Sequence, residues 1–462
     1  MRKTYRILLL VFWVIGANSC MVGPNFQKVP VESPADYRFA IAPADTINSL
    51  NWRKFYTDTT LIRLIDSALV NNFDAKIAAS RILEARYYLG YTKADQYPAF
   101  TYGGNVNYGN APGNFPTGSS PKFSGAMIGN LNWEIGFWGK YRRATEAAQA
   151  ELVATEYGYQ AVKISLITEI ANTYYTLLSY KKSLEISKNT LEIRKESSRI
   201  ISARYNRGIV PEIDLNQAQI LEESAAGSVP VYERAVAFTE NALSMLLGKN
   251  PEVIPVYLTI DEVLTPDSIP VGLPSQLLVR RPDVLEAEQM VAAQNARIGV
   301  AQAMRFPSFS LTGMLGMASA DLSAFNAGDA LMGGVGAGLF GPIFNFGKNK
   351  RRVDIERERT EQMKLNYEKA VVSAFRETED ALVNISTLER ELVSVENQLK
   401  ASTNAARLSR SRYDGGVTSY LEVLEAERTL FDIELYHTQL QQTRLIAYSN
   451  LYKTLGGGWE NQ

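Results

Sequence analysis

The chain has 462 residues, 46% of them hydrophobic and 21% charged, and its formal net charge is −1; this length has room for two or three domains. A near-neutral balance gives no support for nucleic-acid binding, which needs a basic surface that neutralises phosphates. The single histidine, His437, and the single cysteine, Cys20, cannot supply the four ligands of a closed zinc site. No motif around His437 indicates a catalytic triad, so we expect no metal, no cofactor, no enzyme activity and no nucleic-acid partner.

Residues 1–19 are predicted to be a secretory signal peptide. A positively charged start precedes an apolar run at 7–15 and then small residues, the charges being Arg2, Lys3 and Arg6. The apolar run is too short to span a bilayer, which takes about 20 residues. A short anchor helix is the alternative.

The small residues that end in Cys20 resemble a bacterial lipobox. This resemblance implies cleavage before Cys20 and lipidation of the new N-terminus. The next residue is Met21 rather than aspartate, which by the same resemblance favours retention in the outer membrane. A cysteine placed there by chance is the alternative.

The rest of the chain is a tandem duplication. Residues 71–100 match residues 280–309, and three further matches share an offset of 208 residues: Gly139-Lys140 with Gly347-Lys348, 204–210 with 412–418, and Leu247-Gly248 with Leu455-Gly456. We therefore predict two structural repeats at 60–248 and 275–456. A connection at 249–274 joins them, a linker at 20–59 precedes them, and a tail at 457–462 follows.

Each repeat has the same predicted order of elements. A helix near its start, at 60–97 or 275–306, ends close to a proline. Two short segments of alternating polarity follow, and then two long helical segments. These helical segments are 141–207 and 212–247 in the first repeat, and 349–414 and 419–455 in the second. Apolar residues recur in them at spacings of three and four, which indicates coiled-coil packing.

The short alternating segments have the pattern of membrane strands. They lie at 100–109, 122–133, 308–317 and 331–340, each about the 10 residues that a tilted transmembrane strand requires. A soluble antiparallel sheet is the alternative. Four strands cannot close a barrel, and an open sheet edge in lipid leaves backbone groups unsatisfied. Several chains must therefore contribute strands, and three would give twelve.

Several stretches resemble one known family, the TolC-like outer-membrane factors, and in particular the lipoprotein branch that serves resistance-nodulation-division (RND) efflux pumps. The strongest match is GLPSQLLVRRPDVLEAEQMVAAQNARIGVAQAMRFPSFSLTGMLG at 272–316, with its Leu-Pro-Ser, Arg-Arg-Pro-Asp and Phe-Pro elements. Residues 20–26, 51–72 and 341–352 also match in kind. The resemblance covers essentially all of the mature chain.

The resemblance implies a homotrimer, mainly α with a membrane β part. Long coiled-coil helices would form a trimeric α-barrel, and four strands per chain would form a 12-stranded β-barrel. The protein would be lipid-anchored in the cell outer membrane through Cys20 and would extend into the periplasm. Residues 20–59 and 249–274, with the C-terminus, would form an equatorial collar. Prolines would mark the junctions of barrel and helices, namely Pro98, Pro307 and Pro342.

The two long helix pairs each turn at a glycine: Gly208 in the first repeat, and Gly415 and Gly416 in the second. Glycine can adopt the left-handed conformation that ends a helix. In the resembling family these turns lie at a closed periplasmic aperture. By that resemblance Glu422 and Glu425 would form an acidic ring there, which would attract cations and raise the pKa of its own members.

The resemblance also implies a latch beside this ring. Tyr413 matches the latch tyrosine and Asp214 matches its acid, while the latch arginine of some members falls at Thr418. Arg207 or Arg412 could replace that arginine. The alternative for Glu422 is a capping box with Ser419, which would satisfy free amides at the helix start.

The leading functional hypothesis is a passive exit duct for small molecules, the outer-membrane channel component of a tripartite efflux system. Its partners would be a periplasmic membrane-fusion adaptor, an inner-membrane RND transporter and outer-membrane lipid. One alternative is the outer-membrane duct of a type I protein secretion system. The other is a periplasmic coiled-coil adaptor lipoprotein, which would lack membrane strands.

Overall fold

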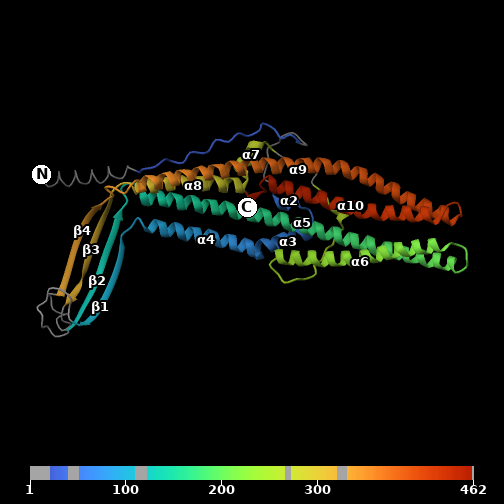
Figure 1. The fold of residues 1–462 in the computed structure, drawn as a ribbon, viewed down its shortest axis with the longest axis horizontal. Coiled ribbons are helices and arrows are strands. Elements are labelled where there is room, and N and C mark those ends of the chain that lie inside the picture. Colours follow the sequence, from blue (N-terminus) through green and yellow to red (C-terminus); the bar gives the residue numbers. More distant parts are fainter. Residues whose placement is uncertain (1–20, 40–50, 110–121, 266–271, 320–329, 460–462) are drawn as a thin grey trace. The chain divides into compact units, whose positions relative to one another are not determined.

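The computed structural model describes residues 21–39, 51–109, 122–265, 272–319 and 330–459. The predicted signal peptide and Cys20 lie outside these residues. Figure 1 shows the elements, which in chain order are α2 (Trp52–Phe55), α3 (Thr59–Asn71), α4 (Phe73–Ala94), β1 (Ala99–Gly109), β2 (Lys122–Ile135), α5 (Lys140–Tyr205), α6 (Glu212–Leu246), the short helix η2 (Ile260–Glu262), α7 (Pro274–Arg280), α8 (Pro282–Ala303), β3 (Ser308–Ser319), β4 (Leu331–Phe340), α9 (Lys348–Asp414) and α10 (Tyr420–Thr454). Among them, no helix combines the length and apolar character that crossing a membrane requires.

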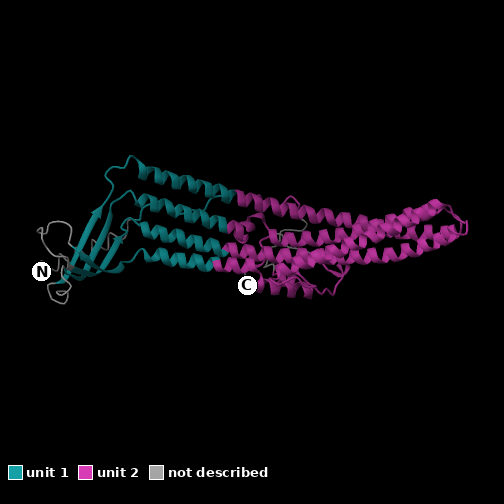
Figure 2. Cartoon of the chain, turned by 60° about the horizontal axis from the view of Figure 1, so that its bottom comes forward, with its two compact units in different colours: residues 1–30, 81–156, 286–368 teal, residues 31–80, 157–285, 369–462 magenta. Residues whose placement is uncertain are grey.

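The chain divides into two compact units, which Figure 2 shows in different colours. Unit 1 takes its described residues from 1–30, 81–156 and 286–368. Unit 2 takes them from 31–80, 157–285 and 369–462. Each unit therefore draws on both halves of the duplicated sequence.

Unit 1 contains a four-stranded antiparallel sheet in the order β1-β2-β3-β4. Its strands have 11, 14, 12 and 10 residues. Every residue of β1 is exposed, including Tyr102 at 88%, and Val335 of β4 is 95% exposed. The sheet thus leaves large apolar side chains uncovered within the described chain, and β1 and β4 are its edges.

The segment that follows Cys20 is clamped onto unit 1 by Arg143. This arginine, 3% exposed, donates from Nε to the Val22 carbonyl at 3.2 Å and from Nη2 to the Gly23 carbonyl at 3.0 Å and Asn25 Oδ1 at 2.9 Å. Gly23 has a φ of +104°, and a Cβ there would lie 2.5 Å from the Cα of Gly299. Only glycine permits this close approach, so residues 22–25 pack in one fixed position against α5 and α8.

The core of unit 2 gathers side chains from the short N-terminal helices and the long helices, among them Leu61, Ile65, Tyr174 and Tyr452. Asp58, itself buried, begins α3 by accepting from the Thr60 amide at 2.7 Å. Its other oxygen accepts from the Tyr174 hydroxyl at 2.5 Å. Such a cap satisfies an amide that the helix leaves free, worth about 1 kcal/mol.

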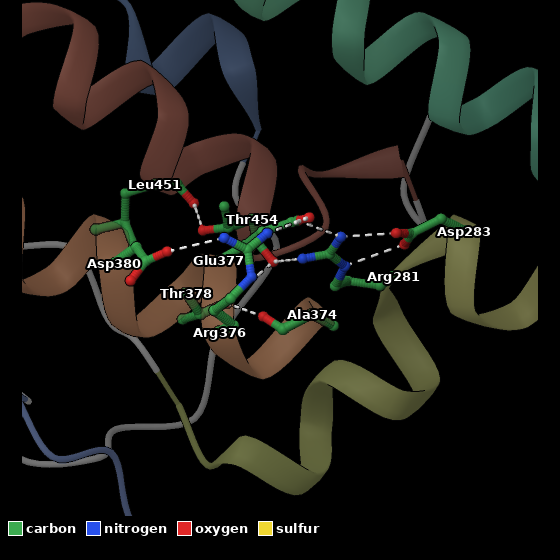
Figure 3. A network of polar contacts seen from close by, with 9 residues as sticks. All are labelled: Arg281, Asp283, Ala374, Arg376, Glu377, Thr378, Asp380, Leu451 and Thr454. Atoms are coloured by element: carbon green, nitrogen blue, oxygen red, sulfur yellow. Dashed lines mark hydrogen bonds and ion pairs between the residues drawn. The ribbon is translucent and has the colours of Figure 1, made fainter. Parts of the chain in front are cut away.

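Arg281 joins three parts of unit 2, as Figure 3 shows. It lies between α7 and α8 and donates to Asp283 at 3.0 and 2.6 Å, to Glu377 of α9 at 2.7 Å and to the Thr454 carbonyl of α10 at 3.3 Å. Burial lowers the pKa of Arg281, but the bonds to Asp283 and Glu377 more than offset this and raise it. The Arg-Arg-Pro-Asp stretch of the sequence is therefore a structural tie between three helices.

Helix α6 contains one irregular feature, Pro230, in its interior. Proline has no amide hydrogen to donate to the preceding turn. Nearby, the Ser228 hydroxyl donates to the Ala225 carbonyl at 2.7 Å. The helix nevertheless continues unbroken from Glu212 to Leu246.

Candidate functional site

The first turn, between α5 and α6, is built on Gly208. Gly208 has a φ of +71°, which favours glycine. Its amide donates to the Tyr205 carbonyl at 2.8 Å, and the Ile209 amide donates to the Arg204 carbonyl at 3.0 Å. This pair of bonds is the Schellman pattern that closes a helix end.

The second turn, between α9 and α10, repeats this geometry. Gly416 has a φ of +74° and donates to the Tyr413 carbonyl at 2.9 Å, and Val417 donates to the Arg412 carbonyl at 2.9 Å. Gly415, one residue earlier, is outside the left-handed region. Figures 1 and 2 both show the two turns at the same end of unit 2.

A small apolar cluster lies behind the two turns and joins them. Its buried members are Ile201, Ala218, Tyr420, Val423 and Leu424, from α5, α6 and α10. Tyr413 packs on the cluster with its ring 5.2 Å from that of Tyr420, and the Arg204 guanidinium lies 5.2 Å from the Tyr413 ring. The two helix pairs are thus held together at this end mainly by apolar and aromatic contacts.

Glu422 is held by two side chains that the sequence did not pair with it. The Thr418 hydroxyl donates to its carboxylate, and the Arg412 Nε lies 3.4 Å from its Oε1. Ser419 makes no side-chain capping bond. The capping-box alternative is therefore wrong in this structure, because Arg412 and Thr418 occupy the carboxylate.

Glu425 lies one turn further along α10. Its side chain is 62% exposed and pairs with Arg428 at 2.8 Å. An exposed pair of this spacing contributes little stability. Both predicted ring acids are therefore exposed on α10, each with one arginine of the same chain beside it.

The other predicted latch residues are not joined to one another in the described chain. The Tyr413 hydroxyl is buried without a hydrogen-bond partner there, so it does not bond Asp214. Asp214 lies half-buried in the first turn of α6. Burial is the main cause that raises the pKa of Tyr420 to about 12, and the charge of Asp214 is a smaller one. Arg207 is exposed in the first turn. Of the two candidate arginines, Arg412 is the one that meets an acid, and that acid is Glu422.

A half-buried charge group behind the turns was not predicted from the sequence. Arg410 of α9 donates from Nη1 to Ser197 Oγ at 2.8 Å and to Glu427 Oε1 at 3.3 Å. Burial raises the pKa of Glu427, opposed by Arg410 and Arg194. A signal existed: Arg194 occupies a seven-residue series of buried positions with Ser187 and Ile201, where a charge is out of place.

A cavity of about 370 Å³ lies beside this group, lined mainly by α5 and α10. Arg194, Glu427, Phe431 and Glu434 are part of its wall, as is His437, the only histidine of the chain. Burial raises the pKa of Glu434, opposed by Lys182. Within the described residues, no three potential metal ligands are grouped so that they could hold an ion.

The predicted junction prolines all lie next to strand ends in unit 1. Pro98 immediately precedes β1, and Pro307 stands between α8 and β3. The Trp138 indole donates to the Pro307 carbonyl at 2.8 Å, while Pro342 follows β4 by two residues. These prolines lie where the chain passes between helix and strand.

Comparison with known proteins agrees with this architecture. The family model described as outer membrane efflux protein matches residues 64–249 and 273–457. The cation efflux system protein CusC of Escherichia coli is 33% identical over 98% of this chain and 99% of its own length. The probable outer membrane lipoprotein SilC of Salmonella typhimurium is 31% identical over 96% of each chain.

A solved structure shows the same fold. The crystal structure of a membrane protein from Pseudomonas aeruginosa matches with a TM-score of 0.88 and 30% identity, over 96% of this chain and 99% of that one. The resemblance to the TolC-like outer-membrane factors is confirmed, and so is the mainly helical fold with four strands. The chain belongs to the outer membrane efflux protein family and is an outer-membrane channel component of an efflux system.

Proposed function

We propose that the chain acts as a homotrimeric passive duct for small molecules, in a tripartite pump with a periplasmic membrane-fusion adaptor and an inner-membrane RND transporter. The observation that carries the trimer is the open sheet, whose edges β1 and β4 have no strand partner in the described chain. Open edges are costly in lipid, where no water can satisfy them. Three copies would pair these edges in a twelve-stranded barrel, with exposed apolar side chains such as Val335 on its surface.

The same assembly would bring together three copies of the long helices. Helices α5 and α9 have 66 and 67 residues, and each is followed by a 35-residue helix. These would form the α-barrel. The division into repeats at 60–248 and 275–456, with a collar from 20–59 and 249–274 and a tail at 457–462, remains our proposal for its organisation. Native mass spectrometry of the detergent-solubilised protein should give three copies, and a monomer would contradict the assembly.

We place the gate of this duct at Glu422 and Glu425, with Tyr413, Asp214, Arg207 and Arg412 as the latch around it. Both glutamates are exposed on α10 just past the second turn. In a trimer six carboxylates would lie near one axis. The Arg412–Glu422 pair at 3.4 Å ties the start of α10 to the end of α9, so it would hold the closed form of the turn.

The gate predicts a conductance change in planar bilayers. The protein with Glu422→Ala and Glu425→Ala should conduct several-fold more current than the unaltered protein and should lose block by polyvalent cations, because the ring charge and its arginine ties are gone. A matched control is Glu192→Ala with Glu196→Ala on α5, since these acids also pair with basic residues three positions on, at 3.1 and 2.6 Å. Unchanged conductance and unchanged cation block in the first variant would remove the gate assignment.

Efflux rather than protein secretion is supported by the names of the relatives, one a cation efflux protein. The two systems can be separated in cells. A deletion strain should become sensitive to small toxic compounds while protein export continues. Sensitivity that stays unchanged while one exported protein accumulates inside the cell would favour the type I system instead.

We also propose that Cys20 carries lipid in the mature protein. The lipobox-like segment supports this, and the relative SilC is named a lipoprotein. The mature protein should be heavier by its acyl groups than the polypeptide that starts at residue 20, and Cys20→Ser should lack that added mass. An intact mass equal to the bare polypeptide would exclude the modification.

A further inference from the structure

Arg194 of α5 is buried, and two of its three guanidinium nitrogens have no hydrogen-bond partner among the described residues. Its exposure is 3%, and its guanidinium lies 4.9 Å from the centre of the Phe431 ring. Nη1 donates to the Leu221 carbonyl at 3.0 Å, but Nε and Nη2 have no partner among the described residues. Nε and Nη2 together form one edge of the guanidinium, the fork that binds a carboxylate with two parallel bonds.

Burial lowers the pKa of Arg194, and among the acids whose charge opposes this shift Glu427 of α10 comes first, ahead of Asp432. Yet Glu427 bonds Arg410 of α9, and only loosely, at 3.3 Å. Charge-assisted bonds of this kind are normally about 2.7–2.9 Å long. Arg410 divides the same nitrogen between Glu427 and Ser197, at 2.8 Å. One carboxylate thus lies between two arginines from different helices and binds one of them weakly.

The unused edge of Arg194 is sealed from solvent in the described chain. A dissolved ligand therefore cannot reach it without a movement of the helices. The nearest candidate within the chain is the Glu427 carboxylate, which would reach the edge in the same movement, because Arg194 and Glu427 both line the cavity of about 370 Å³ between α5 and α10. That space adjoins the Glu427 side chain and gives it room to change direction as α10 moves.

We propose that Glu427 is a two-position carboxylate, paired with Arg410 of α9 in this structure and with the Nε/Nη2 edge of Arg194 of α5 when the channel opens. The exchange lets α10 move against α5 while the half-buried Glu427 carboxylate keeps a partner throughout. A buried charge left alone would oppose such a movement strongly. Two discrete pairings make the helix contact bistable. The proposal rests on the channel having its aperture at the adjacent turns.

The first test is structural and does not depend on conductance. In the Arg410→Met protein, determined by cryo-electron microscopy, the Glu427 carboxylate should bond both Nε and Nη2 of Arg194. A Glu427 side chain that still points away from Arg194, with the Arg194 edge unpaired, would overturn the proposal. Arg410→Gln serves the same purpose if the methionine variant does not fold.

The second test uses single-channel recording and compares two variants whose open probabilities should change in opposite directions. Arg410→Met should raise the open probability several-fold, because it removes the closed-state partner. Arg194→Met, which keeps the apolar contact with Phe431, should lower it several-fold, because it removes the open-state partner. Arg199→Met is the control, since Arg199 is exposed on α5 and pairs with Glu196, its one salt-bridge partner among the described residues.

Shifts of the same sign in the two test variants would mean that both arginines merely support the fold, and this overturns the exchange. If microscopy shows the exchange but the open probabilities do not shift in opposite directions, the exchange is not linked to channel opening. This result would also overturn the proposal. A wrong gate assignment would be recognised by a different result: conductance would stay unchanged when Glu422 and Glu425 are replaced by alanine. Failure of the aperture and failure of the exchange can therefore be told apart.

Discussion

Replacing Arg281 with methionine should lower the free energy of unfolding by about 2–4 kcal/mol. Its side chain is 8% exposed, whereas those of Asp283 and Glu377 are 45% and 37% exposed. Breaking a fully buried pair costs about 3–5 kcal/mol. The expected loss is smaller here because water can reach both carboxylates. The buried Thr454 carbonyl also loses a donor, and methionine preserves most of the apolar contact of the stem.

The matched control is Arg376→Met. Arg376 is 65% exposed and shares one acid with Arg281: it lies 3.8 Å from Glu377, and it also lies 3.2 Å from Asp380. Exposed pairs contribute about 0–1 kcal/mol, so this variant should stay close to the unaltered protein. Chemical denaturation in detergent, followed by circular dichroism, measures both. Equal losses in the two variants would show that burial of Arg281 is not what makes it important.

Gly248→Ala should destabilise the protein by about 2–5 kcal/mol, combining backbone strain with a steric clash. Gly248 has a φ of +68°, and a Cβ there would lie 2.4 Å from the carbonyl oxygen of Asn71. That oxygen belongs to the last residue of α3 and cannot rotate away as a side chain would. The substitution must therefore push α3 from the end of α6, in the core of unit 2.

Gly208→Ala separates the two contributions. Gly208 has nearly the same backbone, φ +71°, but a Cβ there meets nothing within 4 Å. Only the left-handed conformation is then penalised, at about 1–2 kcal/mol. Thermal unfolding of both variants under one set of conditions gives the comparison. If Gly208→Ala is as damaging as Gly248→Ala, the contact with Asn71 has no special weight.

The predictions that rested on the duplication were the most reliable, because a residue kept in both repeats reflects a constraint on backbone conformation. Glycines matched at the offset of 208 residues share their φ values: +78° and +79° for Gly139 and Gly347, +71° and +74° for Gly208 and Gly416. A glycine kept in both copies marks a position that other residues rarely tolerate. Strand positions followed from alternation for a similar reason, since side chains of a strand alternate between two faces.

Side-chain partners were much less predictable. The sequence placed Glu422 and Ser419 three apart, which fits a capping box, but could not show that Arg412 and Thr418 would compete for the carboxylate. Glu427 and Arg194 are far apart in the chain, and their approach depends on how α5 and α10 are rotated about their axes. Periodicity gives the buried face of one helix but not which residue of another faces it.

The fixed position of residues 22–25 limits how far Cys20 can lie from α5. Arg143 already binds the carbonyl of Val22, and successive Cα atoms of a chain are about 3.8 Å apart, so an acyl group on Cys20 would be joined to the fixed segment by only about two residues. A lipid on so short a leash would do more than retain the protein: it would set the height at which α5 meets the membrane surface. Residues inserted after Cys20 would keep the lipid anchor but would no longer fix the position of α5 relative to the membrane surface. Such an insertion would distinguish membrane attachment from positioning.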